Sequence, residues 1–123
     1  MENYEAAIED YTKAIEVDPN HVPSYYNRGL AYEKLKNYSK AFDDYNKIIL
    51  LDPNYSKAYN NRGAVHQKLK HYEQAIEDYT KAIKADPNFA QAYKNRGTAY
   101  EALGKKSKAK ADFAKAKQLE SKK

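Results

Sequence analysis

Apolar residues recur along the chain with the spacing of amphipathic helices. In the first such segment Ala7, Ile8, Tyr11, Ala14 and Ile15 follow the i, i+3, i+4, i+7, i+8 pattern of one helix face. Asp-Pro-Asn follows this segment and two later ones, and it ends each helix because proline disfavours helix in the residue before it. No stretch alternates strictly over a strand's length. The pattern predicts an all-α protein with about seven helices, at residues 3–17, 23–36, 38–51, 56–70, 72–85, 90–103 and 106–120.

The predicted helices belong to two types that alternate with a period of 34 residues. Asn3–Asn20 (NYEAAIEDYTKAIEVDPN) and His71–Asn88 (HYEQAIEDYTKAIKADPN) are identical at 14 of 18 positions, and Asn37–Asn54 lies midway between them. We call this type B. Type A carries Asn-Arg-Gly and occurs three times, as YYNRGLAY from Tyr25, YNNRGAVH from Tyr59 and YKNRGTAY from Tyr93. Such a repeat predicts stacked helix pairs that bury their apolar faces only against neighbouring repeats.

This arrangement resembles the tetratricopeptide repeat (TPR), in which an aromatic residue, Leu-Gly and Tyr precede Ala, an aromatic residue and Pro. The copies read Tyr25, Arg28-Gly29, Tyr32, Ala41, Tyr45, Pro53; Tyr59, Arg62-Gly63, His66, Ala75, Tyr79, Pro87; and Tyr93, Arg96-Gly97, Tyr100, Ala109, Phe113. The resemblance implies a right-handed superhelical array (α-solenoid) of antiparallel helix pairs. We expect a single array over 1–123, comprising the second helix of a partial repeat (3–20) and repeats at 22–55, 56–89 and 90–121, the last ending in a Lys-rich helix.

Each A-type segment carries a glycine in mid-helix, where it costs about 1 kcal/mol relative to alanine. That cost is tolerable if the missing side chain lets a neighbouring helix approach closely. We expect the small partners across this contact to be alanines of the B-type helices, Ala41, Ala75 and Ala109.

Composition excludes several kinds of chemistry. The 123 residues include no Cys, which removes disulfides, thiol nucleophiles and Cys-ligated metals, and the three histidines lack metal-ligand spacing. The paired acids repeat every 34 residues, as a solvated helix face does and a catalytic dyad does not. No apolar run approaches the roughly 20 residues of a membrane span, and no signal-peptide core is present. We therefore expect a cytoplasmic protein with no catalytic activity, no metal and no cofactor.

Arginine stands where the family usually has leucine, at Arg28, Arg62 and Arg96. A buried guanidinium is costly unless it is paired and hydrogen-bonded. Acids recur at the same period in the adjacent helices, at Asp10, Asp44, Asp78 and Asp112. The pattern favours a structural Arg–Asp ladder between helices, and the alternative is an anionic ligand held by the arginines.

The resemblance also implies a binding surface, because the first helix of each TPR lines the concave side of the superhelix. Asn27, Asn61 and Asn95 stand where the family can hold a peptide backbone, and carboxamides both donate and accept hydrogen bonds. A structural role within the repeat remains open for them. Other residues expected in the groove are Tyr26, Leu30, Glu33, Lys34, Lys57, Asn60, Ala64, Gln67, Lys68, Gln91, Lys94, Thr98 and Glu101.

A carboxylate clamp for chaperone C-terminal tails would place Lys, Asn, Asn, Lys and Arg at Tyr26, Leu30, Asn61, Gln91 and Asn95. Only Asn61 matches, so we do not expect chaperone tails as partners. The sequence predicts a protein–protein interaction module, part of a larger protein, that binds a peptide or partner segment of unknown identity on its concave face. The alternative is a structural or self-associating scaffold that uses helix faces at the array ends.

Charge is concentrated at the two ends. Glu2–Asp18 carries six acids and one base, whereas Lys105–Lys123 carries eight lysines and two acids. In the last helix Lys106, Lys110 and Lys117 replace apolar residues, which predicts a solvating cap rather than a nucleic-acid surface. The first helix has no such lysines, so its apolar face predicts weak self-association through the N-terminal helix or end to end. That face comprises Tyr4, Ala7, Ile8 and Tyr11.

Overall fold

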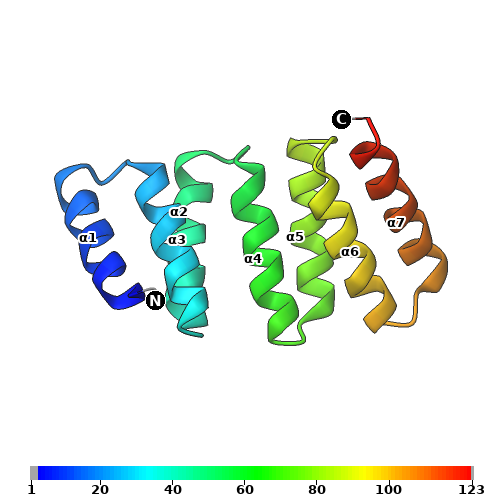
Figure 1. The fold of residues 1–123 in the computed structure, drawn as a ribbon, viewed down its shortest axis with the longest axis horizontal. Helices are drawn as coiled ribbons and strands as arrows, with labels where there is room; N and C mark the ends of the chain where they lie inside the picture. Colours follow the sequence, from blue (N-terminus) through cyan, green and yellow to red (C-terminus); the bar gives the residue numbers. More distant parts are fainter. Residues whose placement is uncertain (1–2, 123) are drawn as a thin grey trace. The chain divides into compact units, whose positions relative to one another are not determined.

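The computed structural model describes residues 3–122 and contains seven α-helices and no strand in that range. The helices are α1 (Tyr4–Val17), α2 (Val22–Lys34), α3 (Tyr38–Leu51), α4 (Ser56–Lys68), α5 (Tyr72–Ala85), α6 (Ala90–Ala102) and α7 (Lys106–Glu120) (Figure 1). The prediction of an all-α protein with seven helices is confirmed. The A-type helices are α2, α4 and α6, and the B-type helices are α1, α3, α5 and α7.

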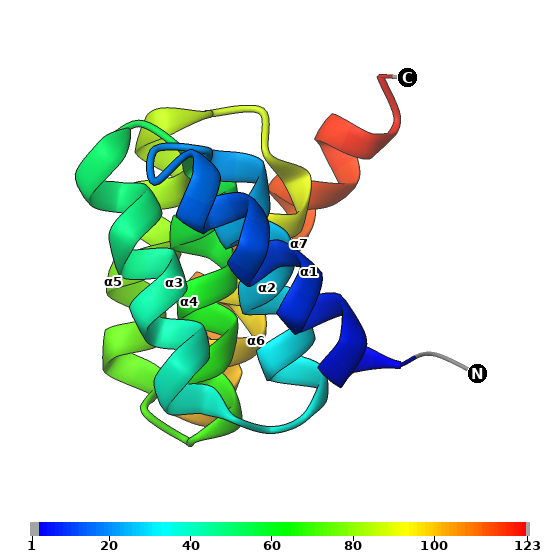
Figure 2. The same ribbon diagram turned by 90° about the vertical axis from the view of Figure 1, so that its left-hand side faces the viewer.

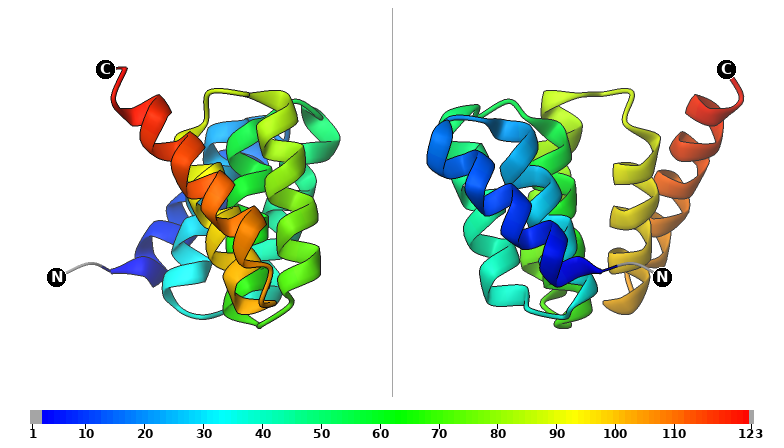
Figure 3. Two further views of the ribbon diagram at one scale, coloured as in Figure 1. Left: turned by 90° about the vertical axis from the view of Figure 1, so that its right-hand side faces the viewer. Right: turned by 60° about the vertical axis from the view of Figure 1, so that its left-hand side comes forward.

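The chain divides after Pro53 into two compact units. The first unit contains α1, α2 and α3, and each helix packs against the next one along the chain (Figure 2). The second unit contains α4 to α7 and is built in the same way, with α7 lying against α6 (Figure 3). In both units an A-type helix packs more extensively against the B-type helix that follows it than against the one before.

The B-type helices begin and end where the residue pattern places them. The side chains of Asn3 and Asn37 cap α1 and α3 by accepting hydrogen bonds from the backbone N–H of Ala6 (3.0 Å) and Lys40 (3.4 Å). The Asp of each Asp-Pro-Asn segment adopts an extended backbone and ends α1, α3 and α5.

The A-type helices end one or two residues earlier than expected. In α2 the predicted end at residue 36 is wrong because Lys36 adopts a left-handed backbone (φ 60°). Its N–H then bonds to Glu33 O (2.9 Å), and the N–H of Asn37 bonds to Tyr32 O (2.8 Å), which is the Schellman motif. The same closure, with Lys70 and Gly104 in the left-handed position, ends α4 and α6.

An aromatic ring of the following B-type helix lies against each mid-helix glycine. A Cβ on Gly63 would lie 2.8 Å from Tyr79 Cε1 and 3.2 Å from the backbone oxygen of Ala75. The Tyr45 ring lies in the same way against Gly29, and the Phe113 ring lies against Gly97. The expectation that Ala75 lies across this contact is confirmed for Gly63, and for Ala41 and Ala109 it stays a prediction. The ring contact forms the core, in which Tyr45 is 0% and Tyr79 is 1% exposed.

Candidate functional site

Three Arg–Asp pairs join each A-type helix to the B-type helix that follows it. In each pair the arginine donates from Nε and Nη2 to the two carboxylate oxygens of an aspartate sixteen residues later. The pairs are Arg28–Asp44 (2.9 and 2.7 Å), Arg62–Asp78 (2.9 and 2.8 Å) and Arg96–Asp112 (2.8 and 2.8 Å). This two-bond geometry is the strongest that a guanidinium and a carboxylate can form.

The arginine of each pair also contacts other neighbouring side chains, as Arg28 shows. Arg28 Nη1 donates to Thr12 Oγ1 (3.0 Å), and its guanidinium carbon lies 5.7 Å from the centre of the Tyr25 ring. The hydrogen bonds to Asp44 raise the pKa of Arg28, so it stays charged at all physiological pH values. Burial raises the pKa of the Asp44 carboxyl, and Arg28 opposes that shift by donating to it. An anionic ligand would have to displace a carboxylate whose side chain is 3% exposed.

Asp10 takes no part in this ladder, although it occupies the same repeat position as the three paired aspartates. It is exposed on α1, and the arginines of the ladder bind Asp44, Asp78 and Asp112 instead. Each of the three paired aspartates is bound by the arginine sixteen residues before it.

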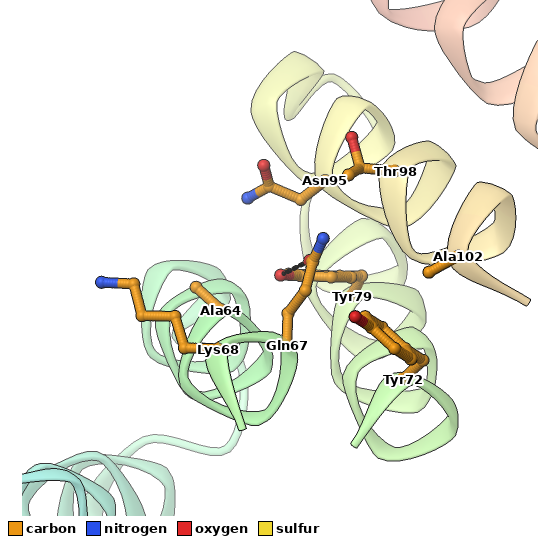
Figure 4. A pocket seen from close by; sticks show the side chains of 8 residues that line it. All are labelled: Ala64, Gln67, Lys68, Tyr72, Tyr79, Asn95, Thr98 and Ala102. Atoms are coloured by element: carbon orange, nitrogen blue, oxygen red, sulfur yellow. Dashed lines mark hydrogen bonds between the residues drawn. The ribbon is translucent and has the colours of Figure 1, made fainter. Parts of the chain in front are cut away.

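A pocket of about 430 Å³ opens in the second unit between α4, α5 and α6 (Figure 4). Three residues come from α4, two from α5 and three from α6. They are Ala64, Gln67, Lys68, Tyr72, Tyr79, Asn95, Thr98 and Ala102. Gln67 reaches from α4 toward α5, where it accepts a hydrogen bond from Tyr79 Oη (2.6 Å), whereas Lys68 extends away from the two tyrosines (Figure 4). The pocket is therefore lined by two tyrosines and by the Gln67 carboxamide that bonds to Tyr79, and Lys68 lies at its edge.

Asn95 is held in place by neighbours on both sides of its carboxamide. Its Oδ1 accepts from Gln91 Nε2 (2.8 Å), and its Nδ2 donates to Asn60 Oδ1 (3.1 Å). A carboxamide has two N–H groups and two acceptor lone pairs, so these bonds leave one of each for a ligand. Asn60 is only 6% exposed, so it does not line the groove as expected and instead accepts the hydrogen bond from Asn95.

The other residues expected in the groove fall in several places. In the first unit Asn27, Leu30 and Lys34 meet Tyr4 and other residues of α1 around a pocket of about 220 Å³. In the 34-residue repeat, α1 and α2 are equivalent to α5 and α6, so this pocket is the counterpart of the part of the larger pocket that α5 and α6 line.

Further expected groove residues lie outside both pockets. Lys57 borders a separate pocket of about 340 Å³ with Gln91, and Lys94 forms an ion pair with Glu120 of α7 (3.2 Å). Asn61 is half-buried on α4, and Tyr26 lies 6.4 Å from the Tyr45 ring. Three pocket residues were not predicted from the sequence, because repeated aromatic and small residues indicate core packing; they are Tyr72, Tyr79 and Ala102.

Within residues 3–122, no group of three or more His, Asp or Glu side chains could hold a metal ion. None of the helices in that range has the length and apolar character needed to cross a lipid bilayer.

Family models and known proteins show what this architecture is similar to. A model described as a tetratricopeptide repeat matches residues 22–55 and 56–89, another matches residues 78–111, and a TPR-repeat model matches residues 1–36. The small glutamine-rich tetratricopeptide repeat-containing protein beta of rat, mouse and human is 56% identical over 34 residues. That stretch is 28% of this chain and 11% of the relative, so the chain spans a small part of these proteins.

Solved structures match over much more of the chain. A crystal structure of MamA superimposes with a TM-score of 0.90 at 33% identity, covering 97% of this chain and 70% of that one. The second TPR domain of Spaghetti (RPAP3), solved with the HSP90 peptide SRMEEVD, matches with a TM-score of 0.77 at 34% identity. That match covers 80% of this chain and 91% of the RPAP3 chain. These matches confirm the α-solenoid class, and the chain belongs to the tetratricopeptide repeat family.

Proposed function

We propose that this chain is a protein-interaction module that binds a short peptide segment at the pocket between α4, α5 and α6. The observation that carries the proposal is a pocket of about 430 Å³, lined by tyrosines, beside the Asn95 carboxamide, whose orientation is set by its hydrogen bonds to Gln91 and Asn60. Ligand pockets generally combine apolar walls with a few well-placed polar groups. Since Asn95 is already oriented, binding it costs little additional side-chain entropy.

The chemistry of the lining specifies the kind of segment. Tyr72 and Ala102 offer an apolar slot for one medium-sized side chain of the ligand. The free donor and acceptor of Asn95 match one peptide unit of an extended backbone. Lys68 is exposed at the rim and favours an acidic residue of the ligand nearby. The preferred ligand is therefore an extended peptide with an apolar anchor and a neighbouring acid.

The relatives support peptide binding in general and no particular partner. The RPAP3 domain holds an HSP90 peptide, which supports peptide capture by the fold. Chaperone tails remain disfavoured for this chain because four clamp positions carry other residues, Tyr26, Leu30, Gln91 and Asn95. Peptide binding on the concave face by Asn27 and Asn61 as well stays a prediction of the family resemblance.

The test uses peptides selected from a random phage-displayed library on the purified chain, with affinities measured by fluorescence polarisation. Thr98→Trp fills the pocket from an exposed position and is expected to abolish binding. Asn95→Ala, and the triple variant Asn27→Ala/Asn61→Ala/Asn95→Ala, should each weaken binding by about tenfold, which corresponds to about 1.4 kcal/mol. Lys81→Trp adds the same ring at an exposed position on α5 and is the matched control.

Circular dichroism must show unchanged helicity for every variant. Peptides that bind Thr98→Trp as tightly as the wild type would place the binding surface elsewhere. If the library yields no enriched peptide, the chain acts as a scaffold through its helix faces.

A further inference from the structure

A second pocket of the same unit lies where α4 and α6 begin. It has a volume of about 340 Å³ and is also bordered by the turn between α5 and α6 and by the last turn of α7. All these segments lie at one end of the second unit (Figure 1). We call it the Phe89 pocket, and we call the pocket between α4, α5 and α6 the Tyr72 pocket.

The two pockets lie on the same faces of α4 and α6. On α6, Gln91 borders the Phe89 pocket, and Asn95 and Thr98 border the Tyr72 pocket, at the i, i+4, i+7 spacing of one helix face. On α4, Lys57 borders the Phe89 pocket and Ala64, seven residues later, borders the Tyr72 pocket. An extended ligand that follows these two helices from one pocket therefore reaches the other.

Hydrogen bonds link the polar groups of the two pockets. Gln91 Nε2 donates to Asn95 Oδ1 (2.8 Å), and Asn95 Nδ2 donates to Asn60 Oδ1 (3.1 Å). Because Gln91 and Asn95 border different pockets, these bonds fix the carboxamides of both pockets relative to each other. The remaining donors and acceptors of the two side chains suit the backbone of a peptide that passes between the pockets.

The separation of the pockets sets the length of such a peptide. Along α6 and α4 the residues that border one pocket lie about eight to ten positions from those that border the other, which is about 12–15 Å at the helical rise. An extended peptide advances about 3.3 Å per residue, so about four residues span this distance.

The lining of the Phe89 pocket suits a tyrosine side chain. Phe89 and Leu119 are half-buried there and provide apolar surface for a ring, and aromatic pairs gain energy beyond the area that they bury. A buried phenolic hydroxyl needs a hydrogen-bond partner. The Oε1 atom of Gln91 and the carboxylate of Asp86 are acceptors at the same pocket.

The charges around the Phe89 pocket disfavour a charged side chain. Glu120 borders the pocket, and Lys94 neutralises it in an ion pair (3.2 Å). The other two charged lining residues, Lys57 and Asp86, have opposite signs. An ion of either sign would lose hydration without a matching net charge, whereas a neutral polar ring would not.

We infer that the Phe89 pocket holds a tyrosine of the same peptide whose apolar anchor enters the Tyr72 pocket, about four residues away along the extended chain. This inference rests on the proposed function and names the class of ligand. The ligand carries two anchors, an apolar residue with a neighbouring acid and a tyrosine, and their spacing is set by the distance between the pockets.

The experiment selects peptides on the purified chain from a phage-displayed library that has a fixed Leu-Glu pair at its centre and random residues on both sides. The fixed pair sets the register on the Tyr72 pocket. Tyrosine is expected to be enriched on one side, about four positions from the Leu. Replacing that tyrosine by alanine in a synthetic peptide should weaken binding by about tenfold, which corresponds to about 1.4 kcal/mol. Removing two residues between the Leu and the tyrosine should weaken binding as much.

Variants of the chain test the pocket itself. Lys57→Trp fills the Phe89 pocket from an exposed position, and Lys57→Ala makes the same charge change without filling it. Lys57→Trp should bind the tyrosine peptide about tenfold more weakly than Lys57→Ala, and the two variants should bind the alanine peptide equally. Circular dichroism must show the same helicity for both variants.

Three results would overturn the inference while leaving peptide binding at the Tyr72 pocket intact. They are selected peptides with no enrichment of tyrosine or phenylalanine about three to five positions from the Leu, equal affinities of Lys57→Trp and Lys57→Ala for the tyrosine peptide, and unchanged affinity of the shortened peptide. Thr98→Trp separates this failure from failure of the proposed function. If Thr98→Trp binds the selected peptides as tightly as the wild type, the Tyr72 pocket is not the binding site and both proposals are wrong.

Discussion

Removing Arg62 from its pair is the sharpest test of the Arg–Asp ladder. The side chain of Asp78 is 3% exposed and that of Arg62 is 19% exposed, so Arg62→Ala leaves a carboxylate buried without its main partner. Breaking a buried ion pair in this way costs about 3–5 kcal/mol. His66 Nε2 lies 3.8 Å from Asp78 and offers weak compensation, and the partial exposure of Arg62 admits water. We therefore expect a loss of about 3 kcal/mol, which is a large share of a typical domain's stability.

Two further variants separate packing from charge. Arg62→Leu restores the residue usual in the family and fills part of the space, so it should cost about 2 kcal/mol, less than Arg62→Ala. Arg62→Leu/Asp78→Leu removes both charges together and should fall within about 1 kcal/mol of the wild type. The double variant is thus expected to be more stable than either single one.

The assay is urea unfolding at neutral pH, followed by the helical circular dichroism signal, because urea does not screen the pair as guanidinium would. Lys81→Ala removes a cation from an exposed position of α5 and should change the free energy of unfolding by less than about 0.5 kcal/mol. A free energy of unfolding for Arg62→Ala equal to that of Lys81→Ala would contradict a structural role for the pair. So would a loss in the double variant equal to the sum of the losses in the two single variants.

Two other predictions concern the second unit. Gly63→Ala places a Cβ 2.8 Å from Tyr79 Cε1 and 3.2 Å from Ala75 O, so despite a gain of about 1 kcal/mol in helix propensity it should lower stability by about 1–2 kcal/mol. A higher melting temperature would contradict this. Burial lowers the pKa of His66, so the unfolded chain takes up the proton first and stability should fall as the pH drops below about 6.5. His66→Tyr should flatten that fall in urea midpoints between about pH 7.5 and 5.5, and parallel curves for the two proteins would refute the assignment.

The sequence determined the helices, their order and their period. Helix formation depends on neighbours three and four residues apart, so the spacing around Ala7, Ile8 and Tyr11 was sufficient to predict α1. The ends of α1, α3 and α5 at Asp-Pro could also be predicted, because proline restricts the backbone of the residue before it. The ends of the A-type helices were less predictable, because Lys36 and Lys70 adopt a left-handed backbone that their residue type does not indicate.

Only the tertiary structure decided which side chains meet. Four aspartates recur with the same period, but which arginine Asp44, Asp78 and Asp112 each bind depends on how the helices stack. Stacking also buried Asn60 beneath Asn95 and brought Tyr72 and Tyr79 to the pocket. A repeat in the sequence specifies equivalent positions, whereas burial and hydrogen bonding depend on whether a neighbouring helix is present at each position.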